Sequence, residues 1–360
     1  MTTDAWIVSH AMISPLGNTS RENYENIQLG KSGIQSRSNY SAAFIDLIRE
    51  GSETRFDTIA RKGLGEILKD ISVPPKTLLI LSTTKGNIER LGQSTVEEIS
   101  LHRSAKKLAN QFGFAHHTVV SSACISGVLA LIVAKRFILS GAYKHTVVLG
   151  ADMLSDFILS GFKSLNALSS EACKPFDKNR SGISLGEAAG AILISSNPSD
   201  FGLTSKIKLQ GFGLSNDANH ISGPSRTGDE LSIAIDRAIN TTGITSRDID
   251  FVCAHGTATL FNDEMEAKAF AKSKVDSSLI NSLKGYFGHT LGAAGVIETI
   301  MTVESMMREE TIASAGFREL GVSVPLNICQ VTQKRKSTNV LKTASGFGGC
   351  NAAIVLQRVN

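Results

Sequence analysis

The sequence predicts an α/β protein in which mixed sheets are covered by helices on both faces. Short runs of β-branched and other apolar residues alternate along the chain with longer helical patterns, which is typical of sheets enclosed by helices. With 360 residues, 42% of them hydrophobic, the chain is long enough to bury a large core. Its 32 glycines indicate a fold with many loops and turns.

The predicted strands are short, apolar and bounded by polar or glycine-containing segments. They comprise residues 77–82, 118–120, 146–149, 191–195, 249–254 and 352–356. The predicted helices repeat apolar residues at helical spacing or are apolar throughout. They comprise residues 95–112, 128–139, 228–241, 263–270 and 293–307. We find no linker, low-complexity tract or short-period repeat, so the alternation continues along the whole chain.

A cysteine lies in the turn between the predicted strand 118–120 and the apolar helix 128–139. Cys124 is therefore at or just before a helix N-terminus, where unpaired backbone N–H groups and the macrodipole favour a thiolate. A sharp strand-to-helix turn also presents a nucleophile to its substrate. Since free cysteines are usually buried and inert, this position alone does not establish catalysis.

Three further segments contain residues suited to chemistry on a carbonyl group. His255 follows the predicted strand 249–254, at the strand end where ligands bind in open α/β sheets. His289 lies among glycines, which allow the backbone to approach a ligand closely. The Gly-Phe-Gly-Gly sequence at 346–349 can direct backbone N–H groups at an oxyanion. Each segment alone is more often structural, but their joint occurrence with Cys124 indicates an active site.

In this order, the motifs make the chain resemble the β-ketoacyl-acyl-carrier-protein synthases, the decarboxylating condensing enzymes of the thiolase superfamily. The likeness runs nearly end to end and includes residues 7–18, 161–162, 167–169, 174–182, 186–190, 262–263 and the segments above. It implies a thiolase-like duplicated five-layer α-β-α-β-α fold with two mixed sheets. Residues 1–200 would form the half with the cysteine, and residues 201–360 the half with both histidines and the glycine turn.

The resemblance also implies an acyltransferase activity and the roles of three residues. Cys124 would accept an acyl chain from an acyl carrier protein, by covalent catalysis. His255 and His289 would donate hydrogen bonds to the enolate formed when malonyl-carrier loses carbon dioxide. The product would be a β-ketoacyl chain for fatty-acid, polyketide or polyene synthesis.

Other residues would support these three. The backbone N–H groups of Cys124 and Phe347 would form the oxyanion hole, and Lys284 would orient one imidazole. Glu298 would lie behind the histidines, as a partner for a buried lysine. Phe347 would gate the pocket, and Ser345 stands where many members have a bulky aromatic residue that helps to hold the gate closed.

Related enzymes with other residue sets fit this chain less well. Thiolases use a second cysteine near the C-terminus, but Cys350 follows two glycines and is better interpreted as filling the family's threonine position. The synthase III branch has asparagine in place of His289, and chain-length-factor subunits lack the nucleophile. Two alternatives stay open: a non-decarboxylating thiolase-like acyltransferase that uses coenzyme A, and a subunit that mainly shapes the pocket of a heterodimeric partner.

The net charge of the chain indicates which kinds of macromolecule it can bind. A net charge of +4 without a dense basic block argues against nucleic acid, whereas a mild basic excess suits an acidic carrier protein. Arg61, Lys62 and Lys107 are candidate docking residues. The segment between residues 17 and 94 is shorter than is typical of the family, and this segment normally contributes to docking.

A homodimer is the default expectation, with residues 118–122 at its interface, and a heterodimer with a ketosynthase-like or chain-length-factor subunit is the alternative.

Composition also indicates the compartment. Five scattered cysteines argue against a disulfide framework or a zinc site and favour the reducing cytoplasm. The N-terminus lacks the pattern of a signal peptide, and the longest apolar stretch, 125–139, is too short and too charged to span a membrane. We expect no metal and no cofactor, because the resemblance implies substrates carried on the phosphopantetheine of the carrier protein.

Overall fold

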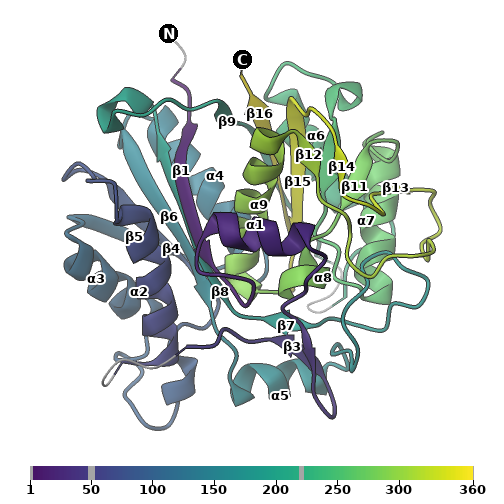
Figure 1. The fold of residues 1–360 in the computed structure, drawn as a ribbon, viewed down its shortest axis with the longest axis horizontal. Helices are drawn as coiled ribbons and strands as arrows, with labels where there is room; N and C mark the ends of the chain where they lie inside the picture. The colour runs from purple at the N-terminus through teal and green to yellow at the C-terminus, as the bar shows by residue number, and fades with distance from the viewer. Residues whose placement is uncertain (1–2, 48–52, 219–222, 360) are drawn as a thin grey trace.

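The computed structural model describes residues 3–47, 53–218 and 223–359 (Figure 1). The first part of the chain contributes five strands to the main sheet, in the spatial order β5-β4-β6-β8-β1. These strands are β1 (Trp6–Ile13), β4 (Leu78–Ser82), β5 (His116–Val120), β6 (His145–Asp152) and β8 (Ala188–Ser195). Strands β5, β4 and β6 are mutually parallel, and β8 pairs antiparallel with both β6 and β1.

The second part of the chain repeats this arrangement, in the spatial order β11-β10-β15-β16-β9. Its strands are β9 (Ile207–Asn216), β10 (Phe251–Cys253), β11 (Leu279–Asn281), β15 (Asn339–Ser345) and β16 (Cys350–Arg358), with β13 (Asn327–Ile328) added beyond β11. Strands β11, β10 and β15 are parallel, and β16 pairs antiparallel with both β15 and β9. In both sets of five strands the third strand in the chain is at one end and the first at the other, so the chain contains two units of the same topology.

The two units meet at their first strands. Trp6 and Ile7 of β1 pair antiparallel with Lys208 and Ile207 of β9, which makes one mixed sheet of eleven strands within the described residues. The resemblance implies two mixed sheets, and the structure links them by this short pairing. The boundary predicted near residue 200 stays a prediction, and the second strand order begins at Ile207.

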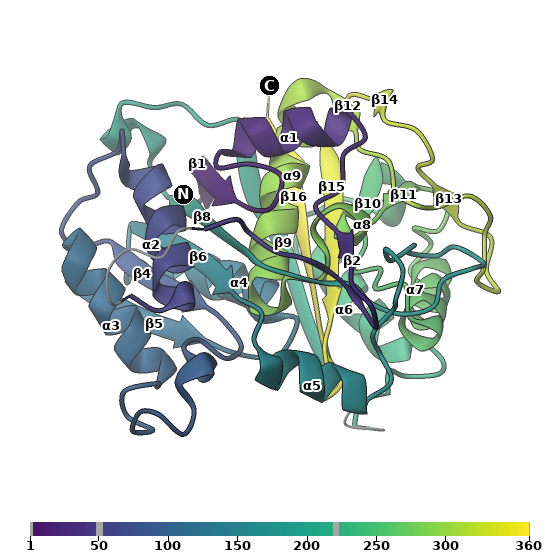
Figure 2. The ribbon, with the colours of Figure 1, turned by 60° about the horizontal axis from the view of Figure 1, so that its bottom comes forward.

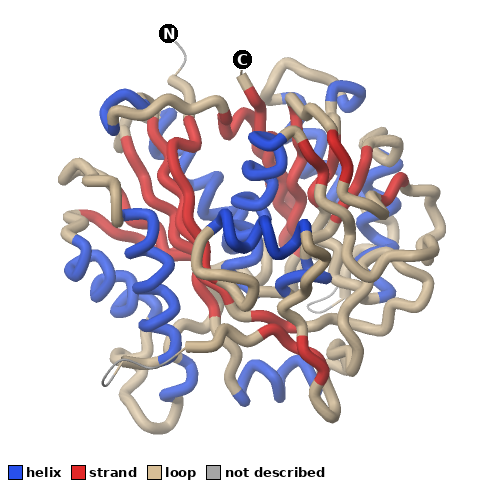
Figure 3. The backbone as a smooth tube through the Cα atoms, in the orientation of Figure 1, coloured by secondary structure: helices blue, strands red, loops and turns tan. Residues whose placement is uncertain are grey.

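Helices cover both units in the predicted layers (Figures 1, 2 and 3). The outer helices of the first unit are α2 (Arg55–Leu68) and α3 (Leu101–Phe112), and those of the second are α6 (Asp229–Asn240) and α7 (Leu260–Lys272). Between the units lie α4 (Ser126–Leu139) and α9 (Ala294–Arg308), which pack against strands of both. Helix α4 is apolar nearly all round because it is buried on both sides.

Short elements complete the chain. The remaining helices are α1 (Ser20–Gln28), α5 (Asp156–Ser164) and α8 (Lys284–Phe287), with 3₁₀ turns η1 (Ile88–Arg90), η2 (Pro198–Phe201), η3 (Ser246–Asp248) and η4 (Leu291–Ala293). Two small sheets are formed by β2 (Gln35–Ser36), β3 (Ser41–Ala43) and β7 (Leu185–Gly186), and by β12 (Glu310–Thr311) and β14 (Gln333–Lys334). No helix in the described ranges combines the length and apolarity that crossing a bilayer requires.

The predicted helices and strands are present, but some helices begin at other residues than predicted, because N-cap side chains determine where they start. The helix predicted over 95–112 begins only at Leu101, because the side chain of Ser100 accepts the N–H of Arg103 and caps it there. The helix predicted over 263–270 is longer, since Thr259 caps α7 by accepting the N–H of Asn262.

Candidate active site

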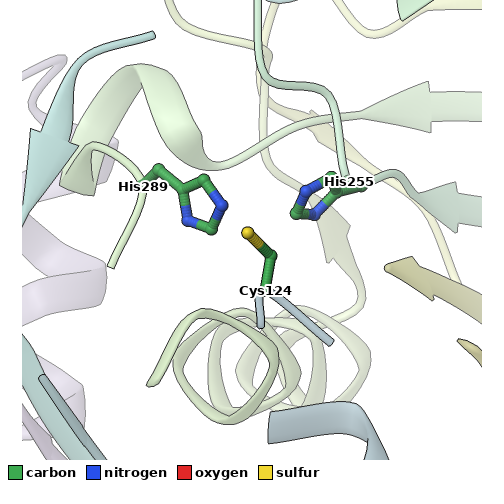
Figure 4. A group of neighbouring side chains, drawn as sticks. All are labelled: Cys124, His255 and His289. Carbon is green, nitrogen blue, oxygen red and sulfur yellow. The ribbon is translucent and has the colours of Figure 1, made fainter. Parts of the chain in front are cut away.

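Cys124, His255 and His289 converge on one cavity of about 320 Å³, although they come from both units (Figure 4). The cysteine sulfur points toward the space between the two imidazole rings. The sulfur and one nitrogen of each ring lie within 4.8 Å of one another. The two rings pack edge to face, with centroids 5.2 Å apart. A single reacting carbonyl group can therefore contact all three side chains.

The turn at Cys124 is strained and is held by local hydrogen bonds. Ala123 has a φ of 45°, a left-handed conformation that is costly for a residue with a Cβ. The Ser126 hydroxyl accepts the N–H of Ser122 at 2.8 Å and donates to the Ala123 carbonyl at 2.6 Å. Because α4 begins at Ser126, the cysteine lies just before a helix N-terminus, as predicted.

The electrostatics of Cys124 differ from the expectation. The thiol is only 8% exposed, and burial raises its pKa to about 12. The charge of Lys284 and the backbone N–H of Phe347 lower this pKa by less. Burial therefore opposes the thiolate in the free protein more strongly than the charge of Lys284 and the backbone N–H favour it, and the favourable effect of the helix N-terminus stays a prediction.

A close contact between the two central helices brings the strand ends of the units together. A Cβ at Gly127 of α4 would lie 2.7 Å from the backbone nitrogen of Val296 and 2.9 Å from Cα of Gly295. Gly295 of α9 approaches the backbone of Gly127 in the same way. Any side chain at either position would force the helices apart, so these glycines fix the distance between Cys124 and the segment that contains His289.

His255 is held by its backbone and by a lysine. Its N–H donates to Glu266 Oε1 at 2.8 Å and to Thr343 Oγ1 at 3.2 Å. Lys284 Nζ lies 3.2 Å from its Nδ1 and also donates to its carbonyl oxygen. Because an ammonium group can only donate, Nδ1 accepts and the imidazole proton is on Nε2.

His289 reaches the same tautomer by a different contact. The backbone N–H of Leu291 donates to His289 Nδ1 at 3.1 Å, which leaves the proton on Nε2. This Nε2 is buried and has no hydrogen-bond partner among the described residues. A buried donor without a partner is costly, so the site is prepared for an acceptor atom that the substrate would supply.

Both histidines are neutral at physiological pH. Burial holds the pKa of His255 and of His289 well below the ordinary value, and the positive charges of Lys284 and Lys342 lower both further. Neutral imidazoles that expose Nε2–H are hydrogen-bond donors rather than general bases.

A buried ionic cluster lies behind the histidines. Lys284 Nζ contacts Glu298 Oε1 at 2.6 Å, and Lys342 Nζ contacts the other oxygen, Oε2, at 2.8 Å. Burial alone would raise the pKa of Glu298, but the two ammonium groups hold it below its ordinary value. The expected contact between Lys284 and Glu298 is thus present, together with a second lysine that we did not expect.

Phe347 and Ser345 line the cavity as the sequence predicts. The Phe347 ring is 38% exposed and stacks on Phe162 with centroids 5.8 Å apart. The two glycines after it have φ of 86° and 76°, which residues with side chains rarely adopt. Ser345 is buried and donates to Asn351 Oδ1 at 2.7 Å across the β15–β16 pair.

The candidate docking residues lie elsewhere. Arg61 and Lys62 line a separate surface depression, and neither they nor Lys107 line the cavity at Cys124. Arg61 pairs with Glu53 at 3.0 Å, and Lys107 pairs with Asp57 at 2.6 Å. The structure does not bring these residues together with the catalytic candidates, and their docking role stays a prediction.

Sequence reasoning missed Lys342, Glu266 and Thr343, all of which are buried around His255. The available signal was a lysine within the otherwise small and apolar run 339–345, since a buried charge requires a partner. Among the described residues, the donor atoms of Cys124, His255 and His289 are close enough to share a metal ion. The neighbouring ammonium groups oppose a divalent cation there, and the expectation of no metal stays a prediction.

Two family models match the chain. The one described as the β-ketoacyl synthase N-terminal domain matches residues 82–199, and the β-ketoacyl synthase C-terminal domain matches residues 207–317. The 3-oxoacyl-acyl-carrier-protein synthase 2 of Vibrio cholerae is 27% identical over 98% of both chains. The polyketide biosynthesis malonyl-acyl-carrier-protein decarboxylase PksF of Bacillus subtilis is 32% identical over 69% of this chain and 63% of that protein.

Solved structures resemble the chain over its whole length. A β-ketoacyl synthase from Burkholderia phymatum superposes with a TM-score of 0.90 at 22% identity, covering 99% of this chain and 100% of that one. The ishigamide ketosynthase/chain length factor gives a TM-score of 0.90 at 23% identity and covers 100% of both chains. At these identities the likeness concerns the fold, and it confirms the predicted thiolase-like α/β architecture.

Proposed function

This chain belongs to the β-ketoacyl-acyl-carrier-protein synthase family and is a condensing acyltransferase of fatty-acid or polyketide synthesis, and we propose that Cys124, His255 and His289 perform its reaction. One observation carries the proposal. Two buried neutral imidazoles both hold their proton on Nε2 beside the same cavity as the cysteine sulfur. This arrangement suits the stabilisation of an enolate next to an acylated cysteine.

The first half-reaction is acyl transfer. The Cys124 sulfur attacks the thioester carbonyl of an acyl-carrier, a carbon–sulfur bond forms, and the carbon–sulfur bond to pantetheine breaks. The thiol proton ends on the departing pantetheine sulfur. The backbone N–H groups of Cys124 and Phe347 stabilise the oxyanion, and the backbone N–H of Phe347 also lowers the pKa of the thiol in the free protein. Burial raises the pKa of the thiol to about 12, so we propose that the proton leaves the sulfur as the carbonyl is attacked.

The second half-reaction is decarboxylation and condensation. The thioester oxygen of malonyl-carrier accepts hydrogen bonds from Nε2 of His255 and His289. Carbon dioxide leaves, and the electrons of the broken carbon–carbon bond form the enolate. Its α-carbon attacks the acyl group on Cys124, a carbon–carbon bond forms, and the thiolate departs and takes up one proton. Products are β-ketoacyl-carrier, carbon dioxide and free Cys124.

Supporting residues keep the two donors in place. Lys284 fixes the tautomer of His255 by donating to its Nδ1 at 3.2 Å, and Glu298 holds Lys284. Phe347 acts as the gate: its ring lies at the mouth on Phe162, between glycine-rich backbone segments that permit movement. Ser345 leaves space at this gate for the acyl chain.

The test separates the two half-reactions in the purified protein. Intact-protein mass spectrometry follows acylation of Cys124 by acyl-carrier, and release of labelled carbon dioxide follows decarboxylation of malonyl-carrier. We expect both, with a β-ketoacyl product two carbons longer than the acyl donor. Acylation without carbon dioxide release would favour the non-decarboxylating acyltransferase. Failure of Cys124 to become acylated would favour the subunit that shapes a partner's pocket.

An acyl carrier protein is the proposed partner, and its phosphopantetheine arm would hold the substrates without any cofactor bound to this chain. The rim of the cavity includes Leu165, Leu260 and Phe261, which are exposed apolar side chains. One solved neighbour is described as a type II polyketide acyl-carrier protein in complex with its ketosynthase. Loss of acylation when free phosphopantetheine thioesters replace the carrier would support docking of the carrier itself.

We also propose a dimer formed along β5. This strand is at the edge of the eleven-stranded sheet, and an edge strand presents unpaired backbone groups to a partner strand. Residues 118–122 would then lie at the interface. Two solved neighbours are described as ketosynthases with their chain length factors, so a heterodimer is the alternative to a homodimer. A monomer by sedimentation at micromolar concentration that is active alone would contradict both forms.

We propose the cytoplasm as the location, because the carrier-bound substrates and a reactive free cysteine require a reducing compartment. All five cysteines are free in the structure. Fractionation of cells followed by immunodetection checks this proposal, and recovery of the protein from an oxidising compartment would contradict it.

A further inference from the structure

Lys342 is a buried charge that the mechanism above does not use. It is the middle residue of β15, a strand in which all seven residues are buried. Its side chain is fully buried. A lysine in this position is costly unless its charge is compensated, so its contacts indicate what it does.

The ammonium group of Lys342 lies among three oxygen atoms. It contacts Glu298 Oε2 at 2.8 Å. It also donates to the carbonyl oxygens of Thr343 and, at 3.4 Å, of Cys253. Cys253 is the last residue of β10, and His255 follows it by two residues. The lysine therefore links the carboxylate behind the site to the strand end from which His255 extends.

Glu298 is shared between two lysines, one on each carboxylate oxygen. The trio of Lys342, Glu298 and Lys284 has a net charge of +1, whereas Lys284 and Glu298 alone would be neutral. The nearest further carboxylate facing His255 is Glu266, whose oxygens accept the N–H groups of His255 and Gly256. With Glu266 ionised, these four groups sum to zero, and without Lys342 they would sum to −1, so the second lysine balances the buried carboxylates beside the histidines.

We propose that Lys342 is a positioning residue for the decarboxylation step, acting on His255 through Glu298 and Lys284. By occupying Oε2 of Glu298, it holds Oε1 on Lys284, and Lys284 is thereby aimed at Nδ1 of His255. Its charge also makes the potential at the two histidines more positive, where the enolate oxygen develops negative charge. The inference rests on the proposed function of the histidines and adds a residue to it.

The electrostatics of the site support this role independently of the contacts. The charge of Lys342 lowers the pKa of both His255 and His289. Burial opposes the charge of Lys342 itself, but Glu298 raises its pKa above the ordinary value. Removing the charge should therefore raise the pKa of both histidines. The acid limb of decarboxylation should then move to higher pH.

The experiment uses the full chain with Lys342→Met, which keeps the length of the side chain, and Lys342→Gln, which keeps a donor for the carbonyl oxygens. Lys135→Met is the matched control, because Lys135 is another buried lysine, and it donates to the carbonyl oxygens of Leu209 and Gln210. We expect both Lys342 variants to release carbon dioxide from malonyl-carrier about 10–100-fold more slowly, the scale seen for outer-shell partners of metal ligands. Acylation of Cys124 should fall less, and Lys135→Met should leave the ratio of the two rates unchanged.

Nitrogen-15 NMR of the histidine rings gives a readout that does not depend on activity. In the Lys342 variants, the pKa of His255 should rise and its Nδ1 resonance should change, as expected when a donor is lost. Folded variants with unchanged resonances and an unchanged acid limb would overturn the inference. Variants that fail to fold while Lys135→Met folds would also overturn it, because Lys342 would then be a structural residue. If wild-type protein lacks decarboxylation, the proposed function fails, while the NMR result still decides the role of Lys342.

Discussion

The two units of this protein have the same strand order but different chemistry at corresponding strand ends. After its third strand, the first unit has Cys124 in a tight turn; the second has Lys284 and His289 at the same topological place. The fourth strand of the first unit ends at Asp152, whereas the fourth strand of the second is followed by the turn with Phe347. The fold thus supplies equivalent positions at the strand ends of both units, and the active site arises only where the two units face each other.

The length of the third connection explains much of this difference. In the first unit, β5 ends at Val120 and α4 begins at Ser126, which leaves room only for the strained turn of the nucleophile. In the second unit, β11 ends at Asn281 and α9 begins at Ala294. The longer segment includes α8 and η4, so it can position an ionic side chain and a histidine.

Asp152 shows how the first unit supports the second. Its carboxylate accepts the Thr83 hydroxyl at 2.8 Å, the Thr84 N–H at 3.0 Å and the Gly292 N–H at 2.7 Å. Burial raises its pKa to about 6, although these hydrogen bonds oppose the rise. Because Gly292 follows His289 closely, Asp152 anchors the histidine segment of the other unit.

The largest expected effect is that of Cys124→Ala, which removes the contribution of the first unit to covalent chemistry. Acylation and condensation should be abolished, while decarboxylation of malonyl-carrier should persist because both donors remain. The free energy of unfolding should change by about 1 kcal/mol, as for other small core truncations. Mass spectrometry, carbon dioxide release and thermal melting check the three parts. An Ala variant that still extends an acyl-carrier would contradict the assignment of Cys124.

His289→Ala should produce the complementary defect from the second unit. Condensation should fall by about 10²–10³-fold, the effect of removing one oxyanion donor. Acyl transfer to Cys124 should fall less, because the imidazole donates to the enolate rather than removing the thiol proton. Single-turnover measurements of both steps test this. Equal losses in the two steps would indicate that His289 acts as a general base, and would contradict separate roles for the two units.

Ser345→Phe tests the gate at the end of β15 with a smaller expected effect. A large side chain at this buried position beside the cavity should narrow the range of accepted acyl chains or slow acylation by long or rigid ones. Overpacking costs about 1–3 kcal/mol, so folding should survive. Competition between short and long acyl-carriers on both proteins measures the preference. If the preference is unchanged, a neighbouring side chain already fills this volume, and Ser345 has no role in specificity.

The smallest expected effect is the pH dependence of the free energy of unfolding. The histidines of the second unit affect it at low pH, and Cys124 of the first unit affects it at high pH. The pKa values of His255 and His289 in the folded protein lie well below 6.5. Their contribution to the free energy of unfolding is therefore complete above pH 6.5. It is lost as the pH falls, because the unfolded chain takes up protons that the folded chain does not. For Cys124 the pKa rises from 9.0 to about 12, so stability is lost as the pH rises above 9. At pH 10 this loss is about 1.4 kcal/mol, since one pKa unit corresponds to that free energy. Denaturant unfolding of wild type and Cys124→Ala at pH 7 and pH 10 checks the difference, and equal losses in both proteins would contradict it.

Much of the fold follows from local patterns, but the ends of elements and the ionic contacts do not. The buried strand β16 and the central helix α4 were evident from runs of apolar residues, because burial on both faces leaves little room for polar side chains. The start of α3 depended on Ser100, one cap among several possible ones. Burial raises the thiol pKa of Cys124, and this effect was not evident beforehand, because a helix N-terminus is visible in a sequence and the depth of burial is not.

The sequence by itself determined the class of fold, the family and the three residues around the cavity, because strand periodicity and ordered motifs are properties of neighbouring residues. Tertiary structure alone decided that Lys342 and Lys284 share Glu298, since the three residues are far apart in the sequence and lie on β15, α8 and α9, which only the fold brings together. It also decided which nitrogen of each histidine holds the proton, because the partners of Nδ1 are a lysine side chain at His255 and a backbone N–H at His289. Burial and long-range pairing depend on all the layers at once, and no local stretch of sequence encodes them.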